Sequence, residues 1–254
     1  MEIITLGSGS KGNSTIVKSG ATTILIDVGF SYAELVRRLE SVNVYPREID
    51  YVFITHDHAD HIYGLKTLLK KINPKVYVNK LIIDNFDYLK DDSKVLELTD
   101  EVIINGNILV KSIPTSHDAT ASNGYLIDDG AESMVIITDT GYINERNFVY
   151  LKNKNYYLME SNHDVMRLRN GRYPIKLQER ILSDVGHMSN EMSAFYMTKM
   201  IGPNTKKIML CHLSEENNTP ALALDAYKKV FSDYEIDFDN FGIASQYEAV
   251  TVND

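Results

Sequence analysis

One segment constrains this chain more than any other, because it places three histidines and two aspartates within six residues: His56-Asp57-His58-Ala59-Asp60-His61. It follows a short apolar run, Tyr51–Ile54, which predicts a buried strand that ends in a polar loop. Imidazole nitrogens and carboxylate oxygens are ligands of borderline divalent metals. Without a metal these polar groups would lack compensating partners, so the segment predicts a metal site rather than a solvated loop.

The spacing within this segment divides its donors into two sets. Side chains alternate along a strand, so His56 and His58 can point to the same side. Asp60 and His61 then lie at the start of the next element, where a turn can direct them toward a second metal. The segment alone therefore has enough donors for more than one ion.

Length and composition favour a globular protein with a sizeable core. The chain has 254 residues, of which 44% are hydrophobic, and no linker or low-complexity tract marks a domain boundary, so we expect a single domain over residues 1–254. The formal net charge of -9 argues against tight non-specific binding to nucleic acid or to an anionic membrane.

A single cysteine, Cys211, lies in an apolar, strand-like run, so we expect it in the core and not among the metal ligands. One cysteine allows no intrachain disulfide, which is consistent with a reducing compartment. The chain starts directly with a strand-like segment and has no apolar run of membrane-spanning length. These features predict a cytoplasmic protein that does not bind membranes.

The first thirty residues contain a pattern that resembles a dinucleotide fingerprint without its structural context. Gly7, Gly9 and Gly12 follow the strand-like run 2–6, but the segments 14–17 and 22–26 are β-branched, whereas the fingerprint requires a helix. A glycine-rich turn between antiparallel strands is the better interpretation. Asp27 ends the third strand, where we expect its carboxylate to accept hydrogen bonds from the metal-binding loop as an outer brace.

Further ligand-type residues occur where other predicted strands end. His117, Asp139 and His212 each come just after an apolar run of strand character. Helical spacing and capping residues predict helices between these runs, for example after Ser31 and after Ser189. Because the same pattern recurs, we expect one end of a sheet sandwich to gather all of these donors at one site.

These residues resemble the metallo-β-lactamase superfamily, whose hallmark H-x-H-x-D-H is matched by residues 56–61, with Asp27, His117, Asp139 and His212 matching its remaining motifs in order. The segments 6–14, 138–141, 160–164, 186–190 and 212–218 resemble the YycJ/WalJ group within it. The resemblance implies an α/β fold, an αββα sandwich of two mixed sheets flanked by helices. Ribonucleases of the tRNase Z type and viral anti-Pycsar enzymes, which open cyclic nucleotides, share this architecture.

The resemblance also implies two divalent metal ions. The first ion would be held by His56, His58, His117 and Asp139. The second would be held by Asp60, His61, Asp139 and His212, so that Asp139 bridges both. Zinc suits the imidazole-rich set, and manganese is the alternative.

For the reaction, we expect a hydroxide between the two ions to attack phosphorus, with Asp60 orienting it or accepting its proton. His187 resembles the general-acid histidine of tRNase Z; the alternative is a histidine that caps a helix start. Ser189, Ser214 and Asn217 are expected substrate contacts, although loop and cap roles account for them equally well. His163 either borders the pocket, as a substrate contact, or ties a helix start to the sheet.

Three functions follow from this interpretation. The leading hypothesis is a phosphodiesterase for 3',5'-cyclic mononucleotides such as cyclic CMP or cyclic UMP, since the chain is acidic and lacks a lysine-rich arm. The resemblance to anti-Pycsar enzymes leaves open whether such an enzyme is cellular or serves viral anti-defence. The alternative is a metal-dependent DNA exonuclease, and the third is a non-catalytic, metal-stabilised regulator. We also expect a homodimer by resemblance. Arg167, Arg169, Arg172 and Arg180 form either a substrate-facing patch or a solvated helical face.

Overall fold

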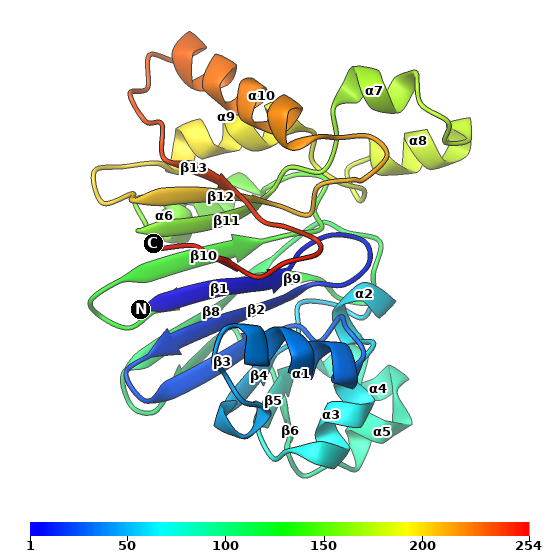
Figure 1. Ribbon diagram of the computed structural model, residues 1–254, viewed down its shortest axis with the longest axis vertical. Helices are drawn as coiled ribbons and strands as arrows, with labels where there is room; N and C mark the ends of the chain where they lie inside the picture. Colours follow the sequence, from blue (N-terminus) through cyan, green and yellow to red (C-terminus); the bar gives the residue numbers. More distant parts are fainter. Residues whose placement is uncertain (254) are drawn as a thin grey trace.

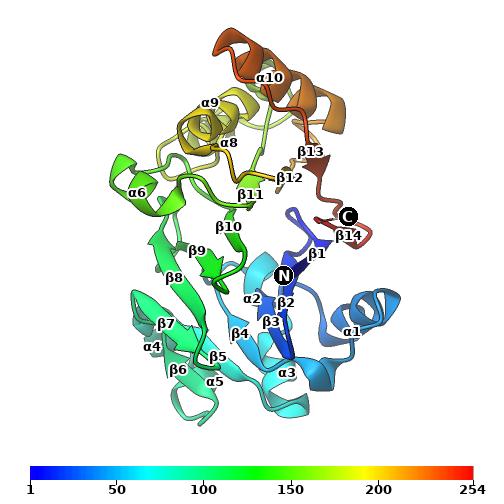
Figure 2. The same cartoon turned by 90° about the vertical axis from the view of Figure 1, so that its left-hand side faces the viewer.

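The computed structural model describes residues 1–253 and consists of two mixed, seven-stranded β-sheets that pack face to face, with helices on both outer faces (Figures 1 and 2). The first sheet contains, in spatial order, β14 (Val250–Thr251), β1 (Glu2–Gly7), β2 (Ser14–Ser19), β3 (Thr22–Ile26), β4 (Tyr51–Phe53), β5 (Lys75–Val78) and β6 (Val95–Glu97). The second contains β13 (Phe241–Ile243), β12 (Lys207–Cys211), β11 (Tyr156–Glu160), β10 (Ser133–Ile137), β9 (Asn123–Asp128), β8 (Ile108–Pro114) and β7 (Glu101–Ile104). The expected αββα sandwich is confirmed.

The helices separate into two groups, one beside each sheet (Figure 1). The group beside the first sheet contains α1 (Tyr32–Ser41), α2 (Ala59–Ile62), α3 (Leu65–Lys71), α4 (Lys80–Asn85), α5 (Asp87–Lys90) and the short 3-10 helix η1 (Pro46–Glu48). The group beside the second contains η2 (Glu145–Asn147), α6 (Phe148–Leu151), α7 (Val165–Arg169), α8 (Ile175–Ile181), α9 (Asn190–Met200) and α10 (Pro220–Asp233).

Both sheets change from antiparallel to parallel pairing at one strand. β3 pairs antiparallel with β2 and parallel with β4, and β10 pairs antiparallel with β9 and parallel with β11. Beyond each switch, the parallel strands all end at the same edge of their sheet. This edge is where chain segments from different parts of the sequence can meet, as in other open sheets that contain parallel strands.

The core has three apolar layers, which follow from the alternation of side chains along the strands. In β3, Ile24 and Ile26 lie between the two sheets, whereas Leu25 packs with Leu35 and Leu39 of α1 on the outer face. A third layer lies between the second sheet and the helices α9 and α10. Each large aliphatic side chain buried in these layers contributes about 1.5–3 kcal/mol to the stability of the sandwich.

Local residues set the ends of the helices beside the first sheet. The helices α4 and α5 are separate, because Phe86 between them has an extended backbone with φ −124° and ψ 109°. At α1, the Ser31 hydroxyl accepts the expected bond from the Glu34 amide. The Glu34 carboxylate pairs instead with two arginines of the next turn, since charge-assisted bonds outcompete the return bond of a capping box.

The expectation that Cys211 lies in the core is confirmed. Cys211 is buried in the layer between the sheets, where burial raises the pKa of its thiol to about 12. In residues 1–253, none of the helices has the length and apolar character that crossing a membrane requires.

Gly29 allows the glycine-rich turn and the loop after β4 to join. The amide of Asn13 donates to the carbonyl of Asp60 at 2.8 Å, and the amide of Gly29 donates to the carbonyl of Asn13 at 3.0 Å. A Cβ atom on Gly29 would lie 1.8 Å from the Asp60 carbonyl oxygen and 2.5 Å from the Asn13 amide nitrogen. Glycine is therefore required for this close approach, which positions Asp60.

We expect Gly29→Ala to lower the free energy of unfolding by about 1–3 kcal/mol, because the added methyl group must displace backbone atoms. Gly20→Asn is the control, since Gly20 has open space around it and a φ of +57°, which asparagine tolerates. Urea denaturation of both variants measures the effect. Equal stability of the two would show that the loops can separate without cost.

Candidate metal centre

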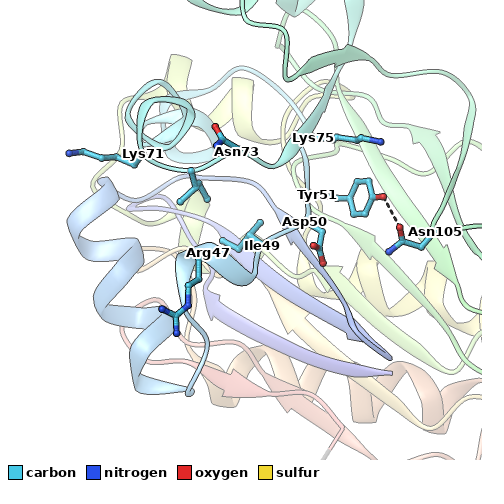
Figure 3. Close-up of a pocket in the computed structure, with 9 residues that line it drawn as sticks. Arg47, Ile49, Asp50, Tyr51, Lys71, Asn73, Lys75 and Asn105 are labelled. Carbon is cyan, nitrogen blue, oxygen red and sulfur yellow. Dashed lines mark hydrogen bonds between the residues drawn. The ribbon is translucent and has the colours of Figure 1, made fainter.

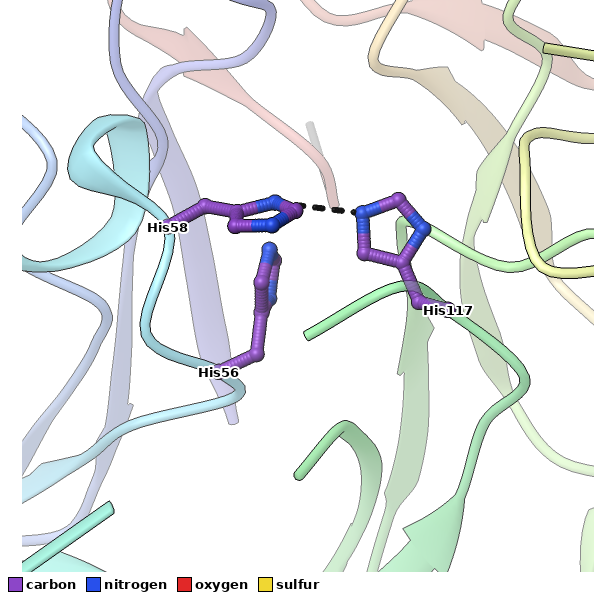
Figure 4. A group of neighbouring side chains, drawn as sticks. All are labelled: His56, His58 and His117. Atoms are coloured by element: carbon purple, nitrogen blue, oxygen red, sulfur yellow. Dashed lines mark hydrogen bonds between the residues drawn. The ribbon is translucent and has the colours of Figure 1, made fainter. Parts of the chain in front are cut away.

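The predicted ligand residues converge at one edge of the sandwich, although they come from both sheets. The loop after β4 carries His56 and His58, and the short helix α2 that follows carries Asp60 and His61. The residues after β8, β10 and β12 supply the remaining three: His117, Asp139 and His212. His58 and His117 meet across the two sheets, with 3.2 Å between His58 Nδ1 and His117 Nε2 (Figure 4). His56 lies beside this pair, and ligand atoms of the three lie within 4.8 Å of one another.

Asp139 lies at the centre of the cluster. Its Oδ2 atom is 3.1 Å from His61 Nε2, and its Oδ1 atom is 3.3 Å from His212 Nδ1 and 3.8 Å from His117 Nε2. Asp60 lies at the outer side, with its Oδ2 atom 3.6 Å from His61 Nε2 and 3.7 Å from His212 Nε2. The donors thus form overlapping groups, and Asp139 and His61 each belong to two of them.

The donor set fits a pair of divalent metal ions. Three buried side-chain atoms of the cluster have no hydrogen-bond partner within residues 1–253: His56 Nε2, Asp139 Oδ2 and His212 Nε2. Leaving several buried polar atoms unsatisfied costs free energy, and all three are atoms that coordinate borderline metals. Nitrogen and carboxylate donors without thiolate suit zinc and also manganese.

Asp27 braces the loop that carries the H-x-H-x-D-H segment. Its carboxylate accepts bonds from the Thr55 amide and hydroxyl, both at 2.8 Å, and lies 2.7 Å from His61 Nδ1. Burial alone would lower the pKa of His61, but the carboxylates of Asp27 and Asp139 raise it to about 10. The bond from Nδ1 to Asp27 directs Nε2 of His61 toward the centre of the cluster, the arrangement of a metal-binding histidine.

Three residues of the site have a left-handed backbone. Asp27, Asp139 and His212 have φ values of 62°, 55° and 54°, a region that side chains other than glycine seldom occupy. Asp27 and Asp139 follow the two strands at which the sheets change pairing, β3 and β10. Such conformations persist where surrounding contacts over-determine them, and here they turn each chain segment back toward the cluster.

Glu160 is a central residue that we did not assign from the sequence. It ends β11 and is fully buried, with Oε1 2.7 Å from His187 Nδ1 and 3.1 Å from His212 Nδ1. Its Oε2 atom accepts the amides of Thr140 and Met188. The signal was present, because Glu160 is one more ligand-type residue at the end of an apolar strand.

Asn13 is a second residue that sequence reasoning missed. Its Nδ2 atom lies 3.2 Å from Asp60 Oδ2 and 3.0 Å from His61 Nε2, and its Oδ1 atom accepts the amide of Gly9. The glycine-rich turn therefore contacts the cluster through an amide side chain. No periodicity or spacing in the sequence points to this contact.

His187 lies beside the cluster and is partly accessible, with 18% of its side chain exposed. Its ring is 5.0 Å from that of His117 and 5.3 Å from that of His212, centroid to centroid. Burial alone would lower the pKa of His187, but the Glu160 carboxylate raises it above its ordinary value. With Nδ1 donating to Glu160, Nε2 is the ring nitrogen that can exchange a proton with another molecule.

The four expected substrate contacts lie near this edge in different environments. Ser189 caps α9 by accepting the amide of Met192, and Ser214 accepts the amide of Asn217. His163 is only 1% exposed, and its carbonyl accepts the amide that starts α9, which favours the interpretation that it ties a helix start to the sheet. Burial lowers the pKa of His163 to about 4.

Two grooves flank the cluster, and a third cleft is remote from it. A groove of about 590 Å³ includes Leu213, Ser214 and Tyr247 among its lining residues, and one of about 410 Å³ includes Asp60 and Tyr63. The remote cleft, of about 540 Å³, lies where β4 and β5 begin and is lined by residues such as Tyr51 and Lys75 (Figure 3). The histidines follow the other end of β4, so this cleft does not adjoin the cluster.

Comparison with known proteins agrees with this geometry. A model of the metallo-beta-lactamase superfamily matches residues 7–212, which span the cluster from the glycine-rich turn to His212. The chain is 40% identical over 224 residues to Exodeoxyribonuclease WalJ of Streptococcus pneumoniae, which covers 86% of this chain and 83% of that protein. It is 35% identical over 247 residues to Exodeoxyribonuclease YycJ of Bacillus anthracis, with 96% and 92% covered.

A solved structure supports the fold independently. The metallo-beta-lactamase fold protein YhfI from Bacillus subtilis superposes with a TM-score of 0.76 at 18% identity, covering 98% of this chain and 99% of that one. The family model and the two relatives confirm the resemblance to the superfamily and to the YycJ/WalJ group that the motifs indicated.

We expect Glu160→Gln to lower the free energy of unfolding by about 1–3 kcal/mol. Both oxygens of the Glu160 carboxylate face backbone amides or imidazoles, and the amide nitrogen of glutamine, which replaces one of these oxygens, cannot accept a hydrogen bond from them. Glu179→Gln, at an exposed position of α8, removes the same charge and should change stability by less than about 0.5 kcal/mol. Urea denaturation in the presence of a chelator compares them. Unchanged stability of Glu160→Gln would contradict the bonding described for Glu160.

Proposed function

Since this chain belongs to the metallo-β-lactamase superfamily and is a metal-dependent hydrolase, we propose that it is an exodeoxyribonuclease that cleaves phosphodiester bonds at the end of a DNA strand. The observation that carries the proposal is the buried Asp139 carboxylate, which lies between His61 and His212 with one oxygen unpartnered within the described chain. The two relatives named as exodeoxyribonucleases, which match most of the chain, support the choice of DNA.

The proposed ligands are those expected from the motifs. One ion is assigned to His56, His58, His117 and Asp139, and the other to Asp60, His61, Asp139 and His212. When bound, two such ions polarise the phosphoryl group and make a water molecule more acidic. Asp60 is proposed to orient the attacking water, since its carboxylate lies at the outer side of the cluster and is steadied by the amide of Asn13.

His187 is proposed as the general acid that protonates the departing oxygen. Its bond from Nδ1 to Glu160 fixes the ring, and the same carboxylate raises the pKa of His187 above its ordinary value, which favours the protonated form of the imidazole. The partial exposure of the side chain supports this role, because a proton donor must reach the substrate. Glu160 would act through His187 as a positioning residue.

Cyclic 3',5'-mononucleotides remain the second candidate substrate. The formal net charge of -9 favours a small substrate, since it opposes binding of a polyanion over a large surface. Both candidates need the same phosphodiester chemistry, so the metal cluster does not discriminate between them. Formation of a homodimer, expected from the resemblance, is a separate proposal. Sedimentation tests it by measuring the mass of the protein in solution.

The proposed function is tested by incubating the zinc- or manganese-loaded protein with an end-labelled DNA strand and, separately, with cyclic CMP, UMP and AMP. We expect stepwise shortening of the DNA, complete loss of this activity with a chelator, and a lower melting temperature of the chelated protein, since bound ions stabilise the native state. Hydrolysis of cyclic nucleotides alone would replace the DNA assignment with the second candidate. Hydrolysis of neither would favour a non-catalytic, metal-stabilised regulator.

We expect His187→Ala to reduce the rate of DNA cleavage by about 10²–10⁴-fold, because the leaving alkoxide would depart without a proton. Bis(p-nitrophenyl) phosphate is the matched control substrate, since its leaving group needs no protonation and its hydrolysis should fall by less than about 10-fold. Rates on both substrates are measured at saturating metal. An equal loss on both substrates would place His187 in a structural role instead.

A further inference from the structure

A basic cleft of about 560 Å³ lies between α7 and the loop that follows His212. Its lining residues include Arg167, Gly171, Arg172, Glu216 and Asn217. In Figure 1, α7 and α8 lie together at the edge of the second sheet. The segment that leads into α7 contacts the metal centre, because the side chain of Asn162 donates to the carbonyl of His212 at 3.0 Å.

The arginines of this segment are not balanced by carboxylates. Arg167, Arg169 and Arg172 are exposed and form no ion pair within residues 1–253, whereas Arg180 pairs with Asp118. Arg167 is partly fixed, since its Nε atom donates to the carbonyl of Glu216 at 2.9 Å. In a chain with a net charge of -9, such a local excess of free guanidinium groups favours an anionic ligand at this position.

Asn217 provides an independent indication of a ligand. The residue is only 2% exposed, and its Nδ2 atom has no hydrogen-bond partner in the described part of the chain. Its backbone is held on both sides, by a bond from its amide to Ser214 Oγ and by a bond from the Asp164 amide to its carbonyl. A buried amide donor left unsatisfied in a rigid frame is costly unless a ligand oxygen accepts from it.

Gly171 lies against two other residues that line the cleft. A Cβ atom on Gly171 would lie 2.8 Å from both Asn217 Oδ1 and the carbonyl oxygen of Arg167, so a larger residue would press against both. Two guanidinium groups and an amide donor together suit the oxygens of a phosphodiester. The Glu216 carboxylate is the one anionic group among the lining residues, and it is exposed at the rim.

We propose that this cleft binds the phosphate backbone of the DNA strand, one or more nucleotides away from the bond cleaved at the metal centre. The proposal rests on the proposed nuclease function and adds a strand-binding site to it. Arg167 and Arg172 supply the charge, and Asn217 supplies a directed hydrogen bond. A cyclic mononucleotide has a single phosphodiester group, so it cannot place one at the metal centre and a second in this cleft, and the site therefore distinguishes a polymer from a monomer.

The test compares the double variant Arg167→Ala/Arg172→Ala with the charge-matched control Lys152→Ala/Lys228→Ala. Both lysines are exposed; Lys152 follows α6 and Lys228 lies on α10. Fluorescence anisotropy measures binding of a labelled, phosphorothioate-linked DNA strand of about 12 nucleotides to the metal-loaded protein. We expect the arginine variant to bind at least about 10-fold more weakly and its salt slope to fall by about 1.4, the value for two contacts to single-stranded phosphates. The lysine control should stay within about two-fold of the wild type.

Hydrolysis separates this proposal from the proposed function. The arginine variant should cleave bis(p-nitrophenyl) phosphate at the wild-type rate, because that substrate does not reach the cleft, while its KM for DNA rises. If the wild-type protein cleaves DNA and the two double variants bind DNA equally well, the proposed binding role of the cleft is wrong and the nuclease function stands. If the arginine variant binds DNA more weakly but the wild-type protein does not cleave DNA, the nuclease function is wrong and the binding role stands.

Two further outcomes complete the test. Arg172→Lys keeps the positive charge at position 172. Binding of DNA by this variant nearer to the wild type than to the double alanine variant supports contact with phosphate. Equal binding of DNA by the wild type and both double variants, or no measurable binding by any of them, overturns the proposal. An RNA strand of the same length serves as a parallel probe, and a preference for it would assign the cleft to RNA instead of DNA.

Discussion

The structure depends on holding several ionisable groups together out of water. Asp139 is buried beside His61 and His212, and burial of a carboxylate opposes ionisation unless positive or hydrogen-bonding partners surround it. Burial alone would raise the pKa of Asp139, but the neighbouring imidazoles hold it well below its ordinary value. The two sheets must therefore meet at this edge in one arrangement, because separation would leave a buried charge without partners.

The topology of the two sheets supplies that arrangement. Each sheet changes from antiparallel to parallel pairing at one strand, β3 or β10, and an aspartate with a left-handed backbone follows each of these strands. Asp27 and Asp139 thus occupy comparable places in the two sheets and have different roles. Asp27 bonds to Thr55 and orients His61, whereas Asp139 lies among the imidazoles themselves.

The surroundings of the cluster give each proposed chemical role a separate support. His187 is bound to Glu160 and remains partly exposed, as a proton donor requires, while Asp60 is steadied by Asn13. The groove beside Tyr247 and the basic cleft beside Arg167 lie on elements outside the cluster. The proposed roles in binding and in cleavage therefore fall on different residues, so that substitutions can test them separately.

The sequence by itself determined the sandwich fold, the family and the edge at which ligand-type residues gather, because strand alternation and a dense local motif are properties of neighbouring residues. It did not single out Glu160, although its place at a strand end matched the pattern, and it left open whether His163 and the arginines face substrate. The tertiary structure showed the contacts of Glu160 and the burial of His163, whereas contact between the arginines and DNA is a proposal. The contact between Glu160 and His212 joins residues 52 positions apart, and the open donor of Asn217 depends on how α7 packs against a distant loop. Such contacts follow from sheet register and packing, which local sequence patterns do not encode.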